Sequence, residues 1–187
     1  MKAPLQHLPL DLPSQLLFQR ACDGDAPAFQ VLVRSYLPAM RAYALKLTGS
    51  TADADDALQE TLLTAWQKLD TLDDPSKVKS WLMTLTGRKC IDLIRARKVN
   101  TPIEDHHDLP SSAPTPETQA ILGAEMRHLS LALKKLPEQQ QQIWLMREYG
   151  GSSYHEIAET LGITTASVRG HLARARVKLL ELMEGKK

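Results

Sequence analysis

Hydrophobic residues recur along most of this chain with the 3.6-residue period of an α-helix, and no segment shows sustained period-two alternation. The chain is therefore predicted to be all-α. Turn residues divide the helical pattern at Asp23–Asp25, at Gly49 and at Asp70–Ser76. The helices predicted from these divisions are Ser14–Cys22, Ala26–Thr48, Ala52–Leu69, Lys77–Lys98, 116–136, 138–149 and the two helices of a helix-turn-helix at Ser153–Met183.

Short local signals predict how the N-terminal helices begin and bend. Pro38 lies inside the predicted helix Ala26–Thr48, where it removes a backbone donor and crowds the preceding turn, so a kink is expected there. Thr51 is expected to cap the following helix. Asp74 and Pro75 have the residue types of a cap and a first helical position, and they precede the last helix of this half.

The helix-turn-helix carries its own start and stop signals. Ser153 and Glu156 have the spacing of a capping box, which satisfies the free amides of a first helical turn. Gly162 follows the last apolar residue of that helix and can adopt the left-handed conformation that ends a helix. A second helix is expected to begin near Thr164 or Thr165. Its 3.6-residue period buries one stripe, made of Val168, Leu172, Ala175 and Leu179.

The opposite face of this second helix is small and cationic, and no acid occurs between Thr164 and Leu180. A low ridge lies between two basic edges: Ala166, Gly170 and Ala173 form the ridge, Arg169 and Arg176 one edge, and Arg174 and Lys178 the other. Such a face suits the major groove of DNA. A solvated basic face on an ordinary core helix would show the same pattern.

The predicted helix Ala52–Leu69 has two distinct faces. Its core face is expected to consist of Leu58, Leu62, Ala65, Trp66 and Leu69. The other face is rich in acids and amides and contains one leucine: Asp55, Asp56, Gln59, Glu60, Leu63 and Gln67. This composition fits a partner surface, and it fits a solvated helix face equally well.

Charge is segregated along the chain, although the net charge is only +1. Residues 88–98 carry five Lys or Arg against one Asp, a basic end that either complements a helix dipole or extends a phosphate-binding track. Residues 99–115, acidic and proline-rich, are predicted to form a flexible linker. The predicted organisation is a disordered lead-in at 1–13, a helical domain at 14–98, this linker, and a helix-turn-helix domain at 116–187.

Composition and motifs exclude several other classes. The cysteines, Cys22 and Cys90, are far apart and form no C-x-x-C, which fits a reducing cytoplasm. No 18-residue apolar run or signal peptide occurs, so neither membrane insertion nor secretion is expected. The pair His106-His107 lies in the acidic linker, where histidines seldom bind metal, and Glu159 replaces the second histidine of an H-E-x-x-H motif. No metal, cofactor or catalytic site is predicted.

Two sequence motifs together resemble the extracytoplasmic-function sigma factors, the small group-4 members of the sigma-70 family. Ala52–Trp66 and Trp81–Lys98 resemble the second conserved region of that family, and Leu136–Leu179 resembles the fourth. The resemblance spans Leu16–Met183 and is specific, because two independent motifs occur in the correct order around a linker. It implies a noncatalytic protein that binds core RNA polymerase in the cytoplasm, recognises minus-ten and minus-thirty-five promoter elements and promotes strand opening.

The resemblance also implies which residues perform each task. Core polymerase binding falls on Asp55, Asp56, Gln59, Glu60 and Leu63. Minus-ten binding and melting falls on Asp70, Thr71, Leu72, Asp73, Lys77, Trp81, Arg88, Lys89, Arg95, Arg97 and Lys98, with Trp81 either a stacking platform or a core residue. Minus-thirty-five binding falls on Thr165, Ser167, Arg169, Gly170, His171, Arg174, Arg176 and Lys178, and Arg169 is expected to read a base.

Some positions depart from the family pattern, and one alternative function remains open. Family members often have Ser and Arg in place of Gly170 and His171, and Asn in place of Arg88, so the promoter sequence does not transfer. An anti-sigma factor is a further partner that the resemblance implies. The alternative is a DNA-binding regulator of the response-regulator output type, because Ser153–Leu179 resembles such helix-turn-helix domains too. A regulator would need a receiver or ligand domain in the N-terminal half, and a receiver needs alternating strands and helices.

Overall fold

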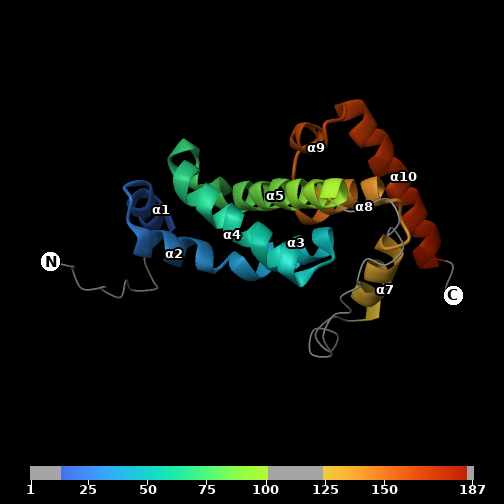
Figure 1. The fold of residues 1–187 in the computed structure, drawn as a ribbon, viewed down its shortest axis with the longest axis horizontal. Helices are drawn as coiled ribbons and strands as arrows, with labels where there is room; N and C mark the ends of the chain where they lie inside the picture. The colour runs from blue at the N-terminus through green and yellow to red at the C-terminus, as the bar shows by residue number, and fades with distance from the viewer. Residues whose placement is uncertain (1–13, 101–123, 185–187) are drawn as a thin grey trace.

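The computed structural model describes residues 14–100 and 124–184, and every regular element within these ranges is helical, as predicted (Figure 1). The N-terminal module contains α1 (Ser14–Cys22), α2 (Ala26–Arg34), α3 (Leu37–Thr48), α4 (Thr51–Lys68), the 3-10 turns η1 (Leu69–Thr71) and η2 (Pro75–Lys77), and α5 (Val78–Asn100). The C-terminal module contains α7 (Ala124–Leu133), α8 (Glu138–Trp144), η3 (Leu145–Tyr149), α9 (Tyr154–Leu161) and α10 (Thr165–Glu184). The predicted lead-in at 1–13, the linker from 101 to 115 with its two histidines, and the helix start at 116 lie outside the described residues.

In the N-terminal module, α3, α4 and α5 pack against one another, and α1 packs on α2. The side of α4 that faces α3 and α5 is lined by small residues, because Ala54, Ala57, Thr61 and Ala65 are its buried positions. The predicted core face was therefore partly wrong: Ala65 and Leu69 are buried, whereas Leu58, Leu62 and Trp66 are only half-buried at its edge. Small side chains let α3 and α5 approach α4 closely, so the buried positions of α4 are its small residues and not the larger apolar residues beside them.

Several predicted boundaries in this module were wrong, each by a local cause. The single kinked helix Ala26–Thr48 is two helices separated at Ser35 and Tyr36, and Pro38 lies in the first turn of α3, where its missing N–H costs nothing. Ser50, and not Thr51, caps α4, because the Ser50 hydroxyl accepts a hydrogen bond from the Asp53 amide at 3.2 Å. The last helix of this module begins at Val78 and continues to Asn100, past the predicted end.

The C-terminal module is organised around α10, which packs against α7, α8 and α9. The predicted helix end at Leu136 was three residues too long, since α7 ends at Leu133. The predicted helix 138–149 changes winding within its length: α8 is α-helical to Trp144, and η3 is a π-helical turn in which the Gly150 amide donates to the Leu145 carbonyl at 2.9 Å. Turns of this kind are rare and often mark functional positions.

The helix-turn-helix signals are confirmed. The Ser153 hydroxyl accepts from the Glu156 amide at 3.2 Å, and the Glu156 carboxylate accepts from the Ser153 amide at 2.7 Å, which completes the capping box. Gly162 ends α9 with φ +65°, in the left-handed region that favours glycine. These local contacts fix the beginning and the end of α9.

Candidate nucleic-acid interface

The outer face of α10 is an exposed basic surface. The predicted stripe of Val168, Leu172, Ala175 and Leu179 is buried, so the opposite side of the helix must face outward. Arg169, Arg174, Arg176 and Lys178 are exposed there, with the small residues Ala166 and Ala173 exposed between them. At the start of the helix, the Thr164 hydroxyl accepts from the Ser167 amide at 3.1 Å. The arrangement matches the low ridge between cationic edges that the sequence predicts.

Two arginines of α10, Arg169 and Arg176, contact side chains from other parts of the C-terminal module. The Arg169 guanidinium lies 5.8 Å from the centroid of the Tyr154 ring, and the Arg147 guanidinium lies 5.0 Å from the same ring. Arg176 donates to the Glu148 carboxylate at 2.5 Å, and this hydrogen bond raises the pKa of the arginine above its usual value. Sequence reasoning missed Tyr154 and Arg147, because their approach to α10 depends on the turn after η3.

The remaining predicted residues of this helix are less accessible. Thr165, Ser167, Gly170 and His171 are half-buried, and the His171 Nδ1 atom is buried without a hydrogen-bond partner among the described residues. Direct contact with DNA is therefore available first to the four exposed cations. The assignment of each residue to a base or a phosphate stays a prediction.

The basic side of α5 forms a second cationic surface, and acids from three elements contact it. Lys89 lies 3.7 Å from Glu60, and Arg97 lies 2.8 Å from Asp53, both on α4. Arg88 lies 3.3 Å from Glu159 of α9, and Lys98 lies 2.5 Å from Glu138 of α8. Arg95 is exposed. The sequence predicted the cations, whereas the acids that pair with Arg88 and Lys98 come from the other module.

The predicted strand-capturing segment, residues 70–77, is not a plain loop. It consists of the short turns η1 and η2, with Asp74 between them. The Asp74 carboxylate accepts from the Ser76 hydroxyl at 2.6 Å and from the Ser76 amide at 2.9 Å, and these hydrogen bonds lower its pKa. These hydrogen bonds between Asp74 and Ser76 stabilise the conformation of the segment. Neither residue is among those predicted to bind DNA.

Side chains of this segment divide between solvent and core. Asp70, Thr71, Asp73 and Lys77 are exposed. Leu72 and Trp81 are half-buried and pack against the hydrophobic core. Trp81 therefore has the packing of a core residue, although it is partly exposed.

The predicted polymerase-binding residues form a continuous surface on α4, which we call the acidic stripe: Asp55, Asp56, Gln59, Glu60 and Leu63. All but Asp55 are exposed, and the Leu63 residue is 54% exposed. Asp55 is half-exposed and accepts from Arg41 of α3 at 2.7 Å, a hydrogen bond that lowers the pKa of the carboxyl group. Arg41 was missed by sequence reasoning, since nothing local predicts a pair that spans two helices.

An apolar groove of about 580 Å³ borders the acidic stripe. Its wall combines α2, the start of α3 and α4, and it is lined by Ala26, Phe29, Gln30, Val33, Arg34, Leu37, Leu62 and Trp66. Leu62 and Trp66 come from the same helix as the stripe, and the rings of Phe29 and Trp66 meet edge to face with centroids 5.2 Å apart. A partner on this side would meet acidic and apolar surface together.

Two kinds of feature are lacking in the described part of the chain. Residues 14–100 and 124–184 hold no group of three or more histidine, cysteine or carboxylate side chains that could bind a metal ion. Across the same residues, no helix has the length and apolar character needed to cross a bilayer.

An exposed basic helix in a helix-turn-helix, together with a second basic helix in a separate helical module, defines a DNA-binding protein of the helix-turn-helix class. Comparison with known families makes the class specific. The family Sigma-70 region 2 matches residues 32–99, and the family Sigma-70, region 4 matches residues 127–179. The chain belongs to the sigma-70 family, as an extracytoplasmic-function sigma factor, and its function is promoter recognition and transcription initiation with RNA polymerase.

Curated relatives support the same membership over most of the chain. The RNA polymerase sigma factor NccH of Alcaligenes xylosoxydans xylosoxydans is 31% identical over 176 residues, which cover 91% of this chain and 94% of the relative. The ECF RNA polymerase sigma factor EcfG of Rhodopseudomonas palustris is 32% identical and covers 79% of this chain and 80% of its own length. The regulator alternative is therefore not favoured. Sigma factors are initiation factors and not enzymes.

Solved structures of sigma factors have the same fold. The sigma factor RpoE from Bartonella quintana, in a complex with the anti-sigma factor NepR, matches with a TM-score of 0.65 and 27% identity, covering 85% of this chain and 98% of that chain. The structure of CnrH in complex with the cytosolic domain of CnrY matches with a TM-score of 0.57 and 25% identity, and the match covers 93% of this chain and 99% of that chain.

Proposed function

We propose that this sigma factor acts in the cytoplasm and divides its contacts among three surfaces. The acidic stripe of α4 binds core RNA polymerase, and the adjacent apolar groove receives an apolar side chain of the same partner. The 70–77 segment and the basic side of α5 hold the displaced strand of the minus-ten element. The outer face of α10 reads the minus-thirty-five element, with Arg169 on a base.

The observation that carries this proposal is the separation of charge between surfaces. The outer face of α10 is cationic and free of acids from Thr165 to Leu179, whereas the acidic stripe is anionic and exposed on a different module. A cationic groove-reading helix suits DNA, and an acidic surface suits a protein partner with basic residues. One chain can therefore hold polymerase and DNA at the same time.

The test is transcription with purified components. The full-length protein and core polymerase, with no other sigma factor, are expected to give promoter-specific initiation from genomic or selected DNA. Permanganate is expected to detect unpaired thymines near the start site only when both proteins are present. Tight duplex binding as a dimer, with transcription only after another sigma factor is added, would instead support the regulator.

An anti-sigma partner is part of the proposal, on the basis of the two complexes found in solved relatives, RpoE with NepR and CnrH with CnrY. Such a partner is expected to compete with core polymerase for this chain. Added before core polymerase, it should lower promoter-specific transcription, and added after stable holoenzyme has formed it should have little effect. An equal effect in both orders would exclude competition.

A further inference from the structure

One tyrosine ring at the start of α9 lies beside an arginine of α10. The Arg169 guanidinium carbon lies 5.8 Å from the centroid of the Tyr154 ring, within the distance of about 6 Å at which a cation is attracted to an aromatic face. Arg169 is exposed, whereas Tyr154 is half-buried and packs against the hydrophobic core. A long, flexible cation on the outer face of α10 therefore contacts a ring that the core of the module holds in place.

Local structure fixes the backbone at this tyrosine. Tyr154 is the first residue of α9 and directly follows Ser153, the residue that caps the helix. The Ser153 hydroxyl accepts from the Glu156 amide, and the Glu156 carboxylate accepts from the Ser153 amide. The capping box therefore determines where the ring of Tyr154 leaves the helix.

A second arginine contacts the same ring from η3. The Arg147 guanidinium carbon lies 5.0 Å from the centroid of the Tyr154 ring, and the Arg147 side chain donates a hydrogen bond to the Ser152 carbonyl at 2.9 Å. Arg147 is half-buried, so its side chain is more restricted than that of the exposed Arg169. The ring is thus held by a fixed cation and meets a less restricted one.

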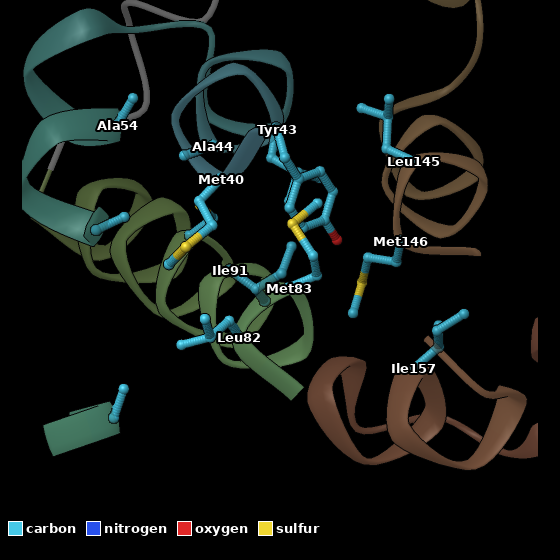
Figure 2. Packing of buried hydrophobic residues seen from close by; sticks show 14 of the residues in the cluster. Met40, Tyr43, Ala44, Ala54, Leu82, Met83, Ile91, Leu145, Met146 and Ile157 are labelled. Carbon is cyan, nitrogen blue, oxygen red and sulfur yellow. The ribbon is translucent and has the colours of Figure 1, made fainter. Parts of the chain in front are cut away.

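The core beneath these residues joins η3 to α9. Met146 precedes Arg147 in η3, Ile157 lies one turn after Tyr154 in α9, and the side chains of Met146 and Ile157 are fully buried. Both belong to one hydrophobic cluster, in which η3 packs on α9 (Figure 2). Arg147 and Tyr154 therefore keep their relative positions.

Arg169 is held differently from Arg176, which lies on the same edge of α10. Arg176 is paired with the Glu148 carboxylate. Across residues 14–100 and 124–184 no carboxylate pairs with Arg169, and the Tyr154 ring is the contact that orients it. An aromatic face takes up none of the strong hydrogen bonds of a guanidinium, whereas a carboxylate takes up one or two. Arg169 is therefore oriented and still able to donate two parallel hydrogen bonds to a guanine edge.

Orientation before binding reduces the cost of reading a base. An arginine that becomes ordered only on DNA loses rotamer freedom at that moment, and this loss opposes binding. In a helix-turn-helix, residues near the N-terminal end of the second helix reach the base edges. Arg169 lies in the second turn of α10, which begins at Thr165. The ring therefore restricts the side chain at a position where base recognition is expected.

We propose that Tyr154 is a positioning residue for promoter recognition, whose ring holds the Arg169 guanidinium in the orientation that reads the minus-thirty-five element. The proposal rests on the proposed function, which assigns Arg169 to a base. It adds a residue outside α10 to the determinants of promoter specificity.

The test measures binding of holoenzyme, assembled from full-length variants and core polymerase, to promoters that differ at single base pairs of the minus-thirty-five element. Tyr154→Leu removes the ring and keeps an apolar side chain against the core. It is expected to lower the preference for the base pair read by Arg169 by about twofold to fivefold, the effect of losing one exposed contact between a cation and a ring. Tyr154→Met, a second variant without the ring, is expected to do the same. Tyr154→Phe keeps the ring and is expected to retain the wild-type preference.

A double variant and a control show whether Tyr154 acts through Arg169. In the Arg169→Ala background, Tyr154→Leu is expected to have no further effect on base preference, because the side chain that the ring positions is absent. The matched control is Tyr36→Leu, which changes a half-buried tyrosine of the N-terminal module that also packs against the core. This control is expected to leave the minus-thirty-five preference unchanged.

Nuclear magnetic resonance of the free, full-length protein gives a readout that does not depend on promoter binding. Relaxation of the Arg169 Nε–H group reports how strongly the guanidinium is ordered on the picosecond to nanosecond timescale. The group is expected to be ordered in wild type and in Tyr154→Phe, and mobile in Tyr154→Leu and Tyr154→Met.

The proposal is overturned if the base preference is unchanged in Tyr154→Leu and Tyr154→Met, or if Tyr154→Phe loses as much of it, since the hydroxyl and not the ring would then act. An equal effect of Tyr154→Leu with and without Arg169 would overturn it too, and so would an unchanged preference in Arg169→Ala. The relaxation result separates these outcomes from a failure of the proposed function. Promoter-specific initiation with Arg169 equally mobile in all variants would retain the sigma function and remove the positioning role. Ordering of Arg169 by the ring, with no initiation, would retain the contact and remove its role in promoter recognition.

Discussion

Arg169 and Arg176 lie on one edge of α10 but have different surroundings. Arg169 rests near the Tyr154 ring at the start of the helix, whereas Arg176 is paired with Glu148. Arg169→Ala is expected to cost about 1–3 kcal/mol on the preferred promoter and to relax preference at one base pair. Arg176→Ala is expected to weaken binding to all DNA sequences alike. It should also reduce the slope of the logarithm of the binding constant against the logarithm of salt concentration by about 1. Holoenzyme binding to a panel of promoter variants measures both, and an unchanged base preference in Arg169→Ala would refute the assigned face.

Tyr43 allows a second test at the scale of one residue, this time on stability. Tyr43→Phe removes a buried hydroxyl that has no partner among the described residues, so the free energy of unfolding is expected to stay equal or to rise by about 1 kcal/mol. Tyr43→Ala leaves a cavity and is expected to cost about 3–5 kcal/mol. Urea denaturation of the full-length chain measures the free energy of unfolding of both variants. A loss of stability in Tyr43→Phe would mean that the hydroxyl has a partner.

At the scale of elements, replacement by alanine is expected to change the free energy of unfolding in opposite directions at two glycines of the helix-turn-helix. Gly162 has φ +65° at the end of α9, so Gly162→Ala is expected to cost about 1–2 kcal/mol. Gly170 lies within α10, where a Cβ atom would meet only the Arg174 guanidinium, at 3.5 Å. Gly170→Ala is expected to gain about 0.5–1 kcal/mol from helix propensity. Chemical denaturation of both variants measures the change in the free energy of unfolding. A change of the same sign in both variants would contradict the assigned turn.

The acidic stripe is also an element-scale feature, because its residues share one face of α4. Replacing Asp55 and Glu60 with arginine is expected to abolish binding to core polymerase, since like charges would face a cationic partner. Helix content by circular dichroism should barely change, because neither position is among the buried residues of α4, and the solvent-accessible ion pairs that are lost, with Arg41 and Lys89, contribute little to stability. The matched control reverses Asp23 and Glu184, which are exposed carboxylates outside α4. Normal core binding by the folded stripe variant would refute this interface.

At the scale of the whole molecule, several carboxylates make stability depend on acid. The pKa of Asp25 is lowered mainly by the Ala28 amide, that of Asp55 by Arg41 and that of Asp74 by Ser76. A group with a lowered folded-state pKa stabilises the protein above its unfolded pKa, and this contribution is lost as pH falls through the folded pKa. The thermal midpoint is therefore expected to fall as pH drops below about 4. Replacing all three with asparagine should flatten this dependence between pH 5 and pH 3, and an unaltered slope would exclude these groups as its cause.

Local sequence signals determined much of the C-terminal module. The capping box at Ser153, the left-handed Gly162 and the buried stripe through Val168 and Leu172 all appear as predicted, because each depends on neighbours within one or two helical turns. Membership in the sigma factor family also follows from local motifs in their order. The assignment of individual residues to DNA or polymerase stays a prediction.

Long-range packing decided what the pattern could not. Hydrophobic period alone placed Leu58, Leu62 and Trp66 in the core, whereas close approach of α3 and α5 buries the alanine line of α4 instead. Pro38 fits either a kink or a helix start, and only the separation of α2 from α3 distinguishes the two. The error on the core face of α4 arises because burial depends on which helices become neighbours, whereas the error at Pro38 concerns where a helix begins.

The sequence by itself determined the helical class, the helix-turn-helix, the basic faces and the family, since these depend on residue type and short spacing. Tertiary structure alone decided that Glu159 meets Arg88, 71 positions away in the chain, and that Tyr43 fits against Gly150. No local rule encodes such pairs, because they exist only once two separately formed helical modules have packed together.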